Sequence, residues 1–451
     1  MKESLKVGVS GVRGVVGESF TPQLAATFAQ AFGTFVGRGP VVVGRDTRPS
    51  GPMLEQAVIA GLQSVGCLPV LLGVVPTPTL LLATKNSSAR GWIAITASHN
   101  AAEWNALKFV DRAGLFLDAT RAEELYDVYH QGDFPLVAES ELPAVSFIRD
   151  AFEKHAARIA AYVDTAGIRA RRFKVAVDCV NGVGAVFTPD WLREAFGCDV
   201  IGLHESPTGV FERGPEPVPE NLARLCKAVR QHGCAVGFAH DPDGDRLAIV
   251  DEYGQPIGED FTLALAAWQV LERHARGPVV ATISTSLCVD AAAKKFGAEV
   301  VRTKIGEINV VEKILQMGAP VGGEGSGGVI VPAVHPCRCA YIAMALVLEL
   351  LAAQQRPVSS LCSDLPEYHV AKTKLAVGGE AAPELLRRLR RSCEERGAKI
   401  SLLDGVHADF GDRWISVRRS NTEPVLRLTA EARTPAAAEA LLRDALAELR
   451  R

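Results

Sequence analysis

The sequence predicts three consecutive α/β/α domains with mixed, largely parallel sheets, followed by a smaller α+β domain. The chain has 451 residues, which is too long for one ordinary core at roughly 150 residues per domain. Short apolar runs end in polar residues and precede helix-length amphipathic stretches, a rhythm typical of parallel α/β units. After residue 366 the rhythm changes to a strand, a charged helix, further strands and a final helix.

Four domains follow from the positions of these runs. Their predicted ranges are residues 1–155, 156–256, 257–365 and 366–451. The predicted boundaries lie near residues that end regular elements, namely Gly254, Pro256, Pro357 and Pro366.

Within the α/β domains, the expected strands are short runs of valine and other apolar residues that stop at a polar residue. These runs are 41–43, 92–95, 175–177, 236–238 and 279–281. The third domain is expected to end in a helix over 341–353. In the C-terminal domain we expect a strand over 369–377, a helix over 383–396 and a last helix after Pro435.

Composition and charge exclude several classes of partner. Lys and Arg total 49 against 52 Asp and Glu, so the net charge is -3, whereas nucleic-acid or membrane-surface binding needs a concentrated basic face. The mean hydropathy is +0.12, and no apolar run reaches the ~18 residues of a membrane span. Ten cysteines without paired spacing and the lack of a signal-like N-terminal segment predict a cytoplasmic protein that binds neither nucleic acid nor membrane.

The pentapeptide Thr96–Asn100 holds a serine directly after the apolar run 92–95. Ser98 should therefore lie at the C-terminal edge of a strand, where open α/β sheets usually bind ligands. Small and polar neighbours leave its hydroxyl accessible for phosphate chemistry. The alternative is a helix cap or an ordinary turn.

A second loop places three carboxylates at alternate positions after an apolar run. Asp241, Asp243 and Asp245 in a tight glycine-containing turn can present hard oxygen donors to Mg²⁺ or Ca²⁺. An EF-hand would have Glu252 at its twelfth position, but its sixth position is Arg246 instead of glycine. A solvated acidic turn is the other alternative.

Two further loops offer hydrogen-bonding groups. In the glycine-rich segment 322–328, Glu324 and Ser326 suit sugar hydroxyls, although a flexible turn between two strands would look the same. Segment 418–424 concentrates donors for a phosphate dianion, against the alternative of a polar turn with an incidental arginine. The donors are Arg418, Ser420, Asn421 and Thr422, with Arg427 just beyond. By contrast, His335, Cys337 and Cys339 lack a second pair of ligands for a zinc site.

These four loops, in this order, resemble the α-D-phosphohexomutase family over essentially the whole chain. The family includes phosphoglucomutases, phosphomannomutases and phosphoglucosamine mutases. Three more segments match its pattern: 11–14, 44–48 and 304–306. The resemblance implies an active site at the centre of the four domains and a hexose phosphate substrate.

The resemblance also implies the reaction. Ser98 would carry a phosphoryl group and pass it to a hexose phosphate, giving a hexose 1,6-bisphosphate that is both intermediate and activator. Mg²⁺ would be held by Ser98 and the three aspartates, with Arg246 beside them. Lys108 is a candidate for general acid/base catalysis or charge support, and Arg13 and His99 would line the same site.

Substrate contacts are carried over in the same way. Lys304 would contact phosphate or sugar, Glu324 and Ser326 would bind sugar hydroxyls, and the 418–422 donors would hold the phosphate that does not react. The sequence departs from the family pattern at Ala101, at Ala106, at 327–328 and at 338–339, which puts a role for the 335–339 stretch in doubt. The residues of segments 105–108 and 325–328 resemble one branch of the phosphoglucosamine mutases and favour glucosamine phosphate among the sugars. A serine-dependent phosphatase and a non-catalytic sugar-phosphate binder remain alternatives.

Overall fold

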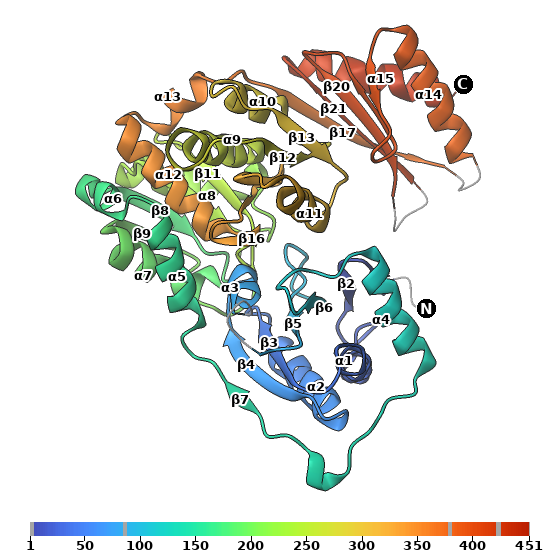
Figure 1. Cartoon of the computed structure of the whole chain (residues 1–451). Helices are drawn as coiled ribbons and strands as arrows, with labels where there is room; N and C mark the ends of the chain where they lie inside the picture. The colour runs from blue at the N-terminus through green and yellow to red at the C-terminus, as the bar shows by residue number, and fades with distance from the viewer. Residues whose placement is uncertain (1–3, 84–87, 378–380, 421–424, 451) are drawn as a thin grey trace. The chain divides into compact units, whose positions relative to one another are not determined.

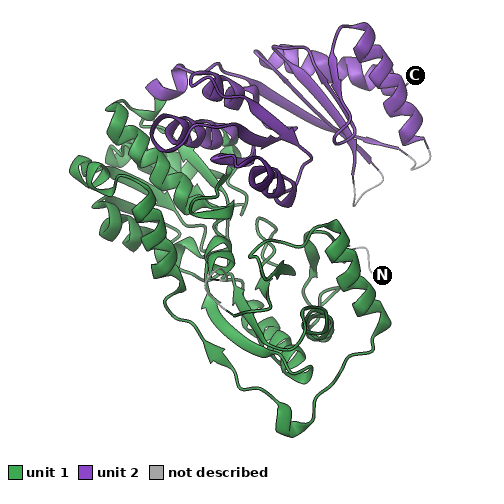
Figure 2. Ribbon diagram, viewed as in Figure 1, with its two compact units in different colours: residues 1–259, 328–359 green, residues 260–327, 360–451 purple. Residues whose placement is uncertain are grey.

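The computed structural model describes residues 4–83, 88–377, 381–420 and 425–450 (Figure 1). The chain divides into two compact units (Figure 2). Unit 1 comprises residues 1–259 and 328–359, and unit 2 comprises residues 260–327 and 360–451.

A mixed seven-stranded sheet begins unit 1, in the order β1-β2-β6-β5-β3-β4-β7. Strand β3 pairs in parallel with β4 and β5, whereas β6 is antiparallel to both β5 and β2. The strands are β1 Lys6–Gly8, β2 Gly11–Val15, β3 Pro40–Arg45, β4 Leu68–Val74, β5 Gly91–Ile95, β6 Trp104–Asp111 and β7 Ser146–Phe147.

Successive side chains along the strands of this sheet point to opposite faces, and each face packs into its own apolar core. Val41 and Val43 pack in one core with α1 and α2, while Val42 packs in the other with residues of α3, as the period of two in a strand requires. Helix α1 begins at a Thr21 cap with proline at its first position. The helices are α1 Pro22–Val36, α2 Gly51–Ser64, α3 Thr77–Leu82, α4 Ala119–Gln131 and the 3-10 turn η1 Glu139–Glu141.

The rest of unit 1 is built around a four-stranded sheet, β11-β10-β8-β9, with β11 antiparallel to its neighbour and the others parallel. Helix α12 is buried on nearly every side and contacts α5 and α6. The elements are α5 Ala151–Tyr162, α6 Thr165–Arg171, β8 Lys174–Asp178, α7 Gly184–Phe196, β9 Asp199–Leu203, η2 Pro219–Asn221, α8 Ala223–His232, β10 Val236–His240, β11 Leu247–Val250, β15 Gly328–Val331, β16 His335–Arg338 and α12 Ala340–Gln354.

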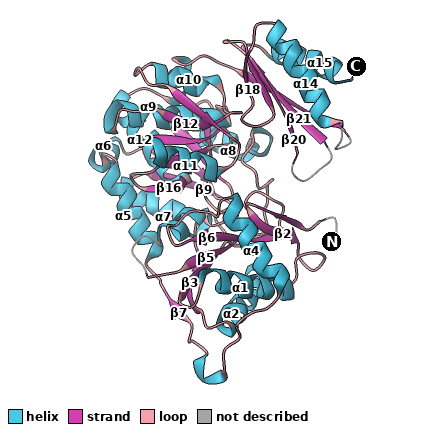
Figure 3. Cartoon of the chain, turned by 45° about the vertical axis from the view of Figure 1, so that its right-hand side comes forward, coloured by secondary structure: helices cyan, strands magenta, loops and turns pink. Residues whose placement is uncertain are grey.

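Unit 2 contains parallel strands and a separate antiparallel sheet. Strand β12 pairs in parallel with β13 and β14, and the other sheet has the order β17-β21-β20-β19-β18. Helices α14 and α15 cover one face of the second sheet (Figure 3). The elements are α9 Glu259–Gln269, the π-helical turn η3 Val270–His274, β12 Val279–Thr282, α10 Leu287–Lys294, β13 Val300–Thr303, α11 Glu307–Met317, β14 Val321–Glu324, β17 His369–Ala376, α14 Ala382–Glu395, β18 Lys399–Ser401, β19 Val406–Asp409, β20 Trp414–Arg419, β21 Val425–Ala432 and α15 Pro435–Arg450, with α13 Val358–Ser363 preceding β17.

This architecture confirms the predicted mixed α/β sheets followed by a smaller α+β part. The strand expected over 369–377, the helix expected over 383–396 and the last helix after Pro435 are β17, α14 and α15. Within the described ranges, no helix combines the length and apolar character that crossing a bilayer requires.

A buried histidine gives the stability of unit 1 a predictable pH dependence. His155 on α5 is 1% exposed; its Nδ1 lies 2.9 Å from Thr79 Oγ1 and its Nε2 lies 3.6 Å from Cys339 Sγ. Burial, with smaller contributions from His335 and Arg158, lowers its pKa to about 3, whereas an unfolded histidine titrates near 6.5.

Between these two pH values the unfolded chain binds a proton that the folded chain does not, so stability falls as the pH falls from about 6.5 toward 3. At pH 5 the expected contribution is a loss of about 2 kcal/mol relative to pH 7.5. Thermal unfolding of wild type and His155→Gln at both pH values checks this. The variant should lose less Tm between the two pH values, and equal losses would contradict the assignment.

Candidate active site

Ser98 lies three residues after the end of β5, at the sheet edge where the sequence predicted it. It is 7% exposed and its φ is +48°, a left-handed conformation that a residue with a Cβ adopts only at some cost. Its N–H donates to Thr96 Oγ1 at 3.0 Å. Its hydroxyl donates to Asp241 Oδ2 at 3.1 Å, so the serine reaches the acidic loop directly.

The acidic loop connects β10 to β11, and its three aspartates are at most 1% exposed. One carboxylate oxygen of each lies within 4.8 Å of the others. Asp241 Oδ1 accepts the N–H groups of Asp245 and Arg246, both at 3.1 Å, and Gly244 turns the loop with a φ of +73°. The alternate spacing therefore does bring three carboxylates to one point.

Besides Arg246, which follows Asp245 in the loop, two cations from other strands lie against this cluster. Lys108 Nζ on β6 is 3.1 Å from Asp243 Oδ2, and Arg338 Nη2 on β16 is 2.5 Å from Asp245 Oδ2. Burial alone would lower the pKa of Lys108, but Asp243 and Asp245 more than offset it and raise that pKa. Lys108 is therefore a protonated ammonium group at neutral pH.

The pKa values of Asp241 and Asp243 shift in opposite directions. Burial, together with the negative charges of Asp245 and Asp243, raises the pKa of Asp241 well above its usual range. Burial acts in the same direction on Asp243, but Lys108 and hydrogen bonds from its neighbours outweigh it and lower the pKa of Asp243. Burial and the neighbouring negative charges thus disfavour the ionised form of Asp241, and a bound cation would favour it.

The donor set fits a divalent metal ion. Asp243 Oδ1 and Asp245 Oδ1 are buried and accept no hydrogen bond from the described residues. Buried carboxylate oxygens without donors are costly unless a cation satisfies them. Hard oxygen ligands of this kind suit Mg²⁺ or Ca²⁺, and an EF-hand is excluded because a strand, β11, starts at Leu247.

Arg13 and His99 lie beside the serine loop. Arg13 on β2 donates from Nη1 to Asn100 Oδ1 at 3.4 Å, and burial lowers its pKa. His99 Nδ1 is 3.4 Å from Ser98 Oγ. Burial, followed by the charge of Arg246, lowers the pKa of His99 to about 3, so its ring is neutral at pH 7. Of the predicted catalytic and metal-binding residues, unit 1 brings all seven together: Arg13, Ser98, His99, Lys108, Asp241, Asp243 and Asp245.

Arg246, predicted to contact substrate, lies next to the metal loop in unit 1. Its Nη1 is 3.2 Å from Glu216 Oε1 and its side chain is 12% exposed. Held this way, its guanidinium is fixed by a carboxylate from the loop that follows β9.

The other predicted substrate contacts lie in unit 2. Glu324 ends β14, and its Oε1 accepts the N–H of Gly306 at 3.1 Å, which joins the 304–306 segment to the glycine-rich turn. Lys304 is exposed and Ser326 is half-buried. Arg418 pairs with Arg427 one residue before the end of β20, and burial lowers its pKa. Ser420 is described, whereas Asn421 and Thr422 lie outside the described residues.

Several residues at the site were not predicted from the sequence. Asp46 and Arg48 form a buried ion pair below the serine loop, and Arg48 Nη2 donates to Ser98 O at 2.9 Å. Thr77 donates to Asp243 Oδ2 at 2.9 Å. The only signal for Asp46 and Arg48 was their place in the 44–48 segment, and Thr77 had none.

The 335–339 stretch, whose role was in doubt, contributes Arg338 to the site. Its two cysteines are not arranged as zinc ligands, because Cys339 caps α12 and accepts the N–H of Ile342 at 3.5 Å. Among the described residues, the group able to hold a metal is the aspartate triad.

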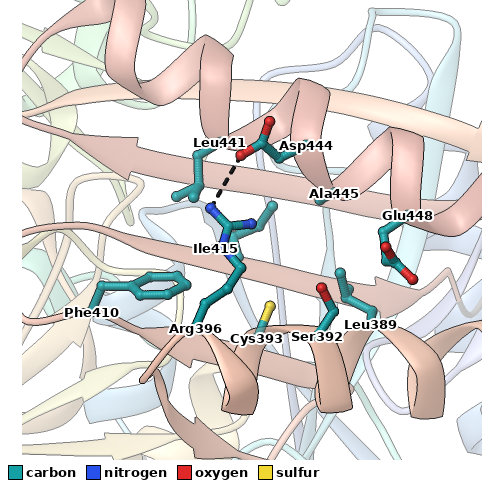
Figure 4. Close-up of a pocket in the computed structure, with 10 residues that line it drawn as sticks. All are labelled: Leu389, Ser392, Cys393, Arg396, Phe410, Ile415, Leu441, Asp444, Ala445 and Glu448. Atoms are coloured by element: carbon teal, nitrogen blue, oxygen red, sulfur yellow. Dashed lines mark hydrogen bonds and ion pairs between the residues drawn. The ribbon is translucent and has the colours of Figure 1, made fainter.

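A small pocket lies elsewhere, between α14 and α15 in the C-terminal part (Figure 4). Its interior of about 10 Å³ is roughly the space of one water molecule. Arg396 and Asp444 in its wall are 3.1 Å apart, and both point toward each other in Figure 4. It is too small for a sugar phosphate.

Four sequence families of phosphoglucomutase/phosphomannomutase domains match the chain in order. They are alpha/beta/alpha domain I over residues 4–136, domain II over 153–254, domain III over 258–368 and the C-terminal domain over 373–449.

Whole proteins and solved structures agree with these families. A protein of Methanopyrus kandleri named "Probable phosphoglucosamine mutase" is 38% identical over 94% of this chain and 93% of its own. A "Phosphoglucomutase/phosphomannomutase" of Thermococcus kodakarensis is 38% identical over 95% and 94%. A phosphoglucomutase/phosphomannomutase family structure from Burkholderia thailandensis has a TM-score of 0.85 at 29% identity, covering 99% of this chain and 98% of that one. The chain therefore belongs to the α-D-phosphohexomutase family and is an intramolecular phosphotransferase.

Proposed function

We propose that the enzyme interconverts hexose 1-phosphates and hexose 6-phosphates through a phosphoserine at Ser98 and a hexose 1,6-bisphosphate intermediate. The observation that carries this proposal is the 3.1 Å contact between Ser98 Oγ and Asp241 within the buried aspartate triad. A hydroxyl held beside a metal-binding cluster is placed for phosphoryl transfer.

Each half-reaction exchanges one P–O bond. In the first, the bond between phosphorus and Ser98 Oγ breaks, a bond from phosphorus to the free sugar hydroxyl forms, and the hydroxyl proton passes to Lys108, which enters this step as the neutral amine, its minor form at neutral pH. The bisphosphate then turns around, and its other phosphoryl group returns to Ser98 Oγ with the reverse proton movement. Lys108 is proposed to hold or donate a proton near the transferring group, or to support it as a charge.

Ser98, Asp241, Asp243 and Asp245 are the residues that would hold Mg²⁺. Such an ion supplies positive charge where negative charge develops on the transferring phosphoryl group. Arg246 and Arg338 add fixed positive charge around the same loop. Arg13 and His99 line the serine loop, and the neutral His99 offers a hydrogen bond without a charge.

Substrate recognition is proposed for the residues of unit 2. Glu324 and Ser326 would bind two sugar hydroxyls, and Lys304 would contact the phosphate or the sugar. Arg418 and Ser420, with Asn421 and Thr422, would hold the phosphate that does not react. The contact between Gly306 and Glu324 supports a common site for the first three.

A direct assay tests the proposal. Purified enzyme, Mg²⁺, a hexose 1-phosphate and a trace of the matching 1,6-bisphosphate should yield the 6-phosphate, with the bisphosphate acting as activator. If no common sugar gives a 6-phosphate, the proposal fails. Release of free phosphate at the rate of substrate loss would instead indicate a serine-dependent phosphatase.

The same assay decides the preferred sugar. Two relatives of equal identity carry different names, phosphoglucosamine mutase and phosphoglucomutase/phosphomannomutase. We propose glucosamine phosphate as the preferred substrate, and expect its kcat/KM to exceed those of glucose and mannose phosphates. Because these sugars differ by one group at C2, differences of about 10- to 100-fold are the expected scale.

A further inference from the structure

We propose that Arg48 and Arg213 are positioning residues that set the geometry between the serine loop and the metal loop. Each forms a buried ion pair with an aspartate. Arg48 donates to two carbonyls of the serine loop, and Arg213 donates to the carbonyl directly before the metal loop. The inference rests on the proposed function, because it concerns how Ser98 and Asp241 are held together.

Arg48 holds the serine loop at two points. It is 0% exposed and pairs with Asp46. Its Nη2 donates to Ser98 O at 2.9 Å and to Asn100 O at 2.5 Å, so one guanidinium spans both sides of His99. A planar guanidinium presents several donors in fixed directions, whereas a lysine ammonium is a compact charge that cannot reproduce this fork.

Asp46 closes a ring of hydrogen bonds around the serine. Its Oδ2 accepts from Thr96 Oγ1 at 2.7 Å, and Thr96 Oγ1 in turn accepts the N–H of Ser98. The left-handed conformation of Ser98 is unfavourable for a residue with a Cβ. Contacts on the N–H and the carbonyl of Ser98 offset that cost, and they keep its hydroxyl directed at Asp241.

Arg213 does the same for the metal loop. Its side chain is 6% exposed, its Nε is 3.0 Å from Asp178 Oδ2, and its Nη2 donates at 2.6 Å to the carbonyl of His240, the residue before Asp241. Asp178 ends β8 and also contacts His204 at 2.9 Å. The anchor of the metal loop is therefore a paired, buried carboxylate on the neighbouring strand.

A hydrogen bond joins the segment of the Asp46–Arg48 ion pair to the segment that follows Asp178. Thr47, between Asp46 and Arg48, donates from Oγ1 to Asn181 O at 2.9 Å. Asn181 lies three residues after Asp178 and has a φ of +55°, and its carbonyl also accepts the N–H of Gly209. All of these residues belong to unit 1. Hydrogen bonds and short backbone segments thus connect the serine loop, through the two ion pairs, to the metal loop.

The two arginines should give different defects. Arg48→Lys is expected to slow phosphorylation of Ser98 by glucose 1,6-bisphosphate about 10- to 100-fold, measured by intact mass, because misplacement by about 1 Å costs rate on this scale. Its half-saturating Mg²⁺ concentration, read as the Mg²⁺-dependent rise in Tm, should change less than about twofold. Arg213→Lys should raise that concentration about 10- to 100-fold, the cost typical of lost support for metal ligands.

Two further variants keep the test decisive. Thr47→Val removes the bridge without removing a charge, and should shift both readouts. Val58→Ala, in the core of the first sheet, is a stability control that should lower Tm without moving either readout. The inference is overturned if the arginine variants show defects no larger than those of Val58→Ala. It is also overturned if Arg48→Lys weakens Mg²⁺ binding while Arg213→Lys slows phosphorylation. If wild type is not phosphorylated at Ser98, the proposed function fails, while the Mg²⁺ readout still tests Arg213.

Discussion

Replacing Ser98 with alanine is expected to abolish turnover and leave the fold intact. The substitution removes the oxygen that would carry the phosphoryl group, and a missing nucleophile typically costs at least about 10⁴-fold in rate. The structural loss is two hydrogen bonds of Ser98 Oγ, one to Asp241 at 3.1 Å and one with His99 Nδ1 at 3.4 Å, and each contributes only about 1 kcal/mol. The measurements are the mutase rate and intact mass after incubation with glucose 1,6-bisphosphate.

A matched serine provides the control. Ser64, the last residue of α2, donates from Oγ to Gly61 O at 2.8 Å and lies in a helix that takes no part in the proposed site. Ser64→Ala should keep the wild-type rate and the mass increase of about 80 Da that one phosphoryl group adds. Full activity in Ser98→Ala would require another nucleophile, and a phosphorylated Ser98→Ala protein would assign the modification to another residue.

The parts of the site that the sequence predicted are local motifs at the ends of strands. Ser98 and the three aspartates could be found because each motif lies within six residues, directly after an apolar run. Open α/β sheets bind ligands at the C-terminal ends of their strands, so each motif could be assigned to a site, although β5 and β10 belong to different sheets. The fold was predictable for the same reason, since the alternation of apolar runs and amphipathic stretches is repeated along the chain.

The supporting residues could not be predicted, because their contacts join distant segments. Arg48 meets the serine loop across 50 residues, Thr77 meets Asp243 across 166, and Arg338 meets Asp245 across 93. A single sequence carries no signal for such pairs when the motif around each is short. The sequence put a role for Arg338 in doubt, because the residues around it depart from the family pattern. In the structure its guanidinium nevertheless forms an ion pair with Asp245 of the metal loop.

The second large effect is expected from Asp243→Asn. Asp243 Oδ2 accepts from Thr77 at 2.9 Å and from Lys108 at 3.1 Å, and an amide can keep the contact with Thr77 while it removes the charge. The triad then offers one fewer anionic ligand, and Lys108 loses its closest counter-charge. We expect kcat/KM to fall at least about 100-fold, more than the loss of a supporting contact would cause.

Stability gives an independent readout of the same change. For wild type, Mg²⁺ at 100 times its Kd should stabilise the folded state by about 2.7 kcal/mol, a gain that removal of Mg²⁺ with EDTA should reverse. In Asp243→Asn most of this gain should disappear. The control is Asp251→Asn, a nearby buried carboxylate that accepts the N–H groups of Tyr253 and Gln255 at 3.0 and 2.8 Å. It should lower Tm yet preserve the response to Mg²⁺. An undiminished Mg²⁺ response in Asp243→Asn would mean that the ion binds without this carboxylate, and the metal role of the triad would have to be abandoned.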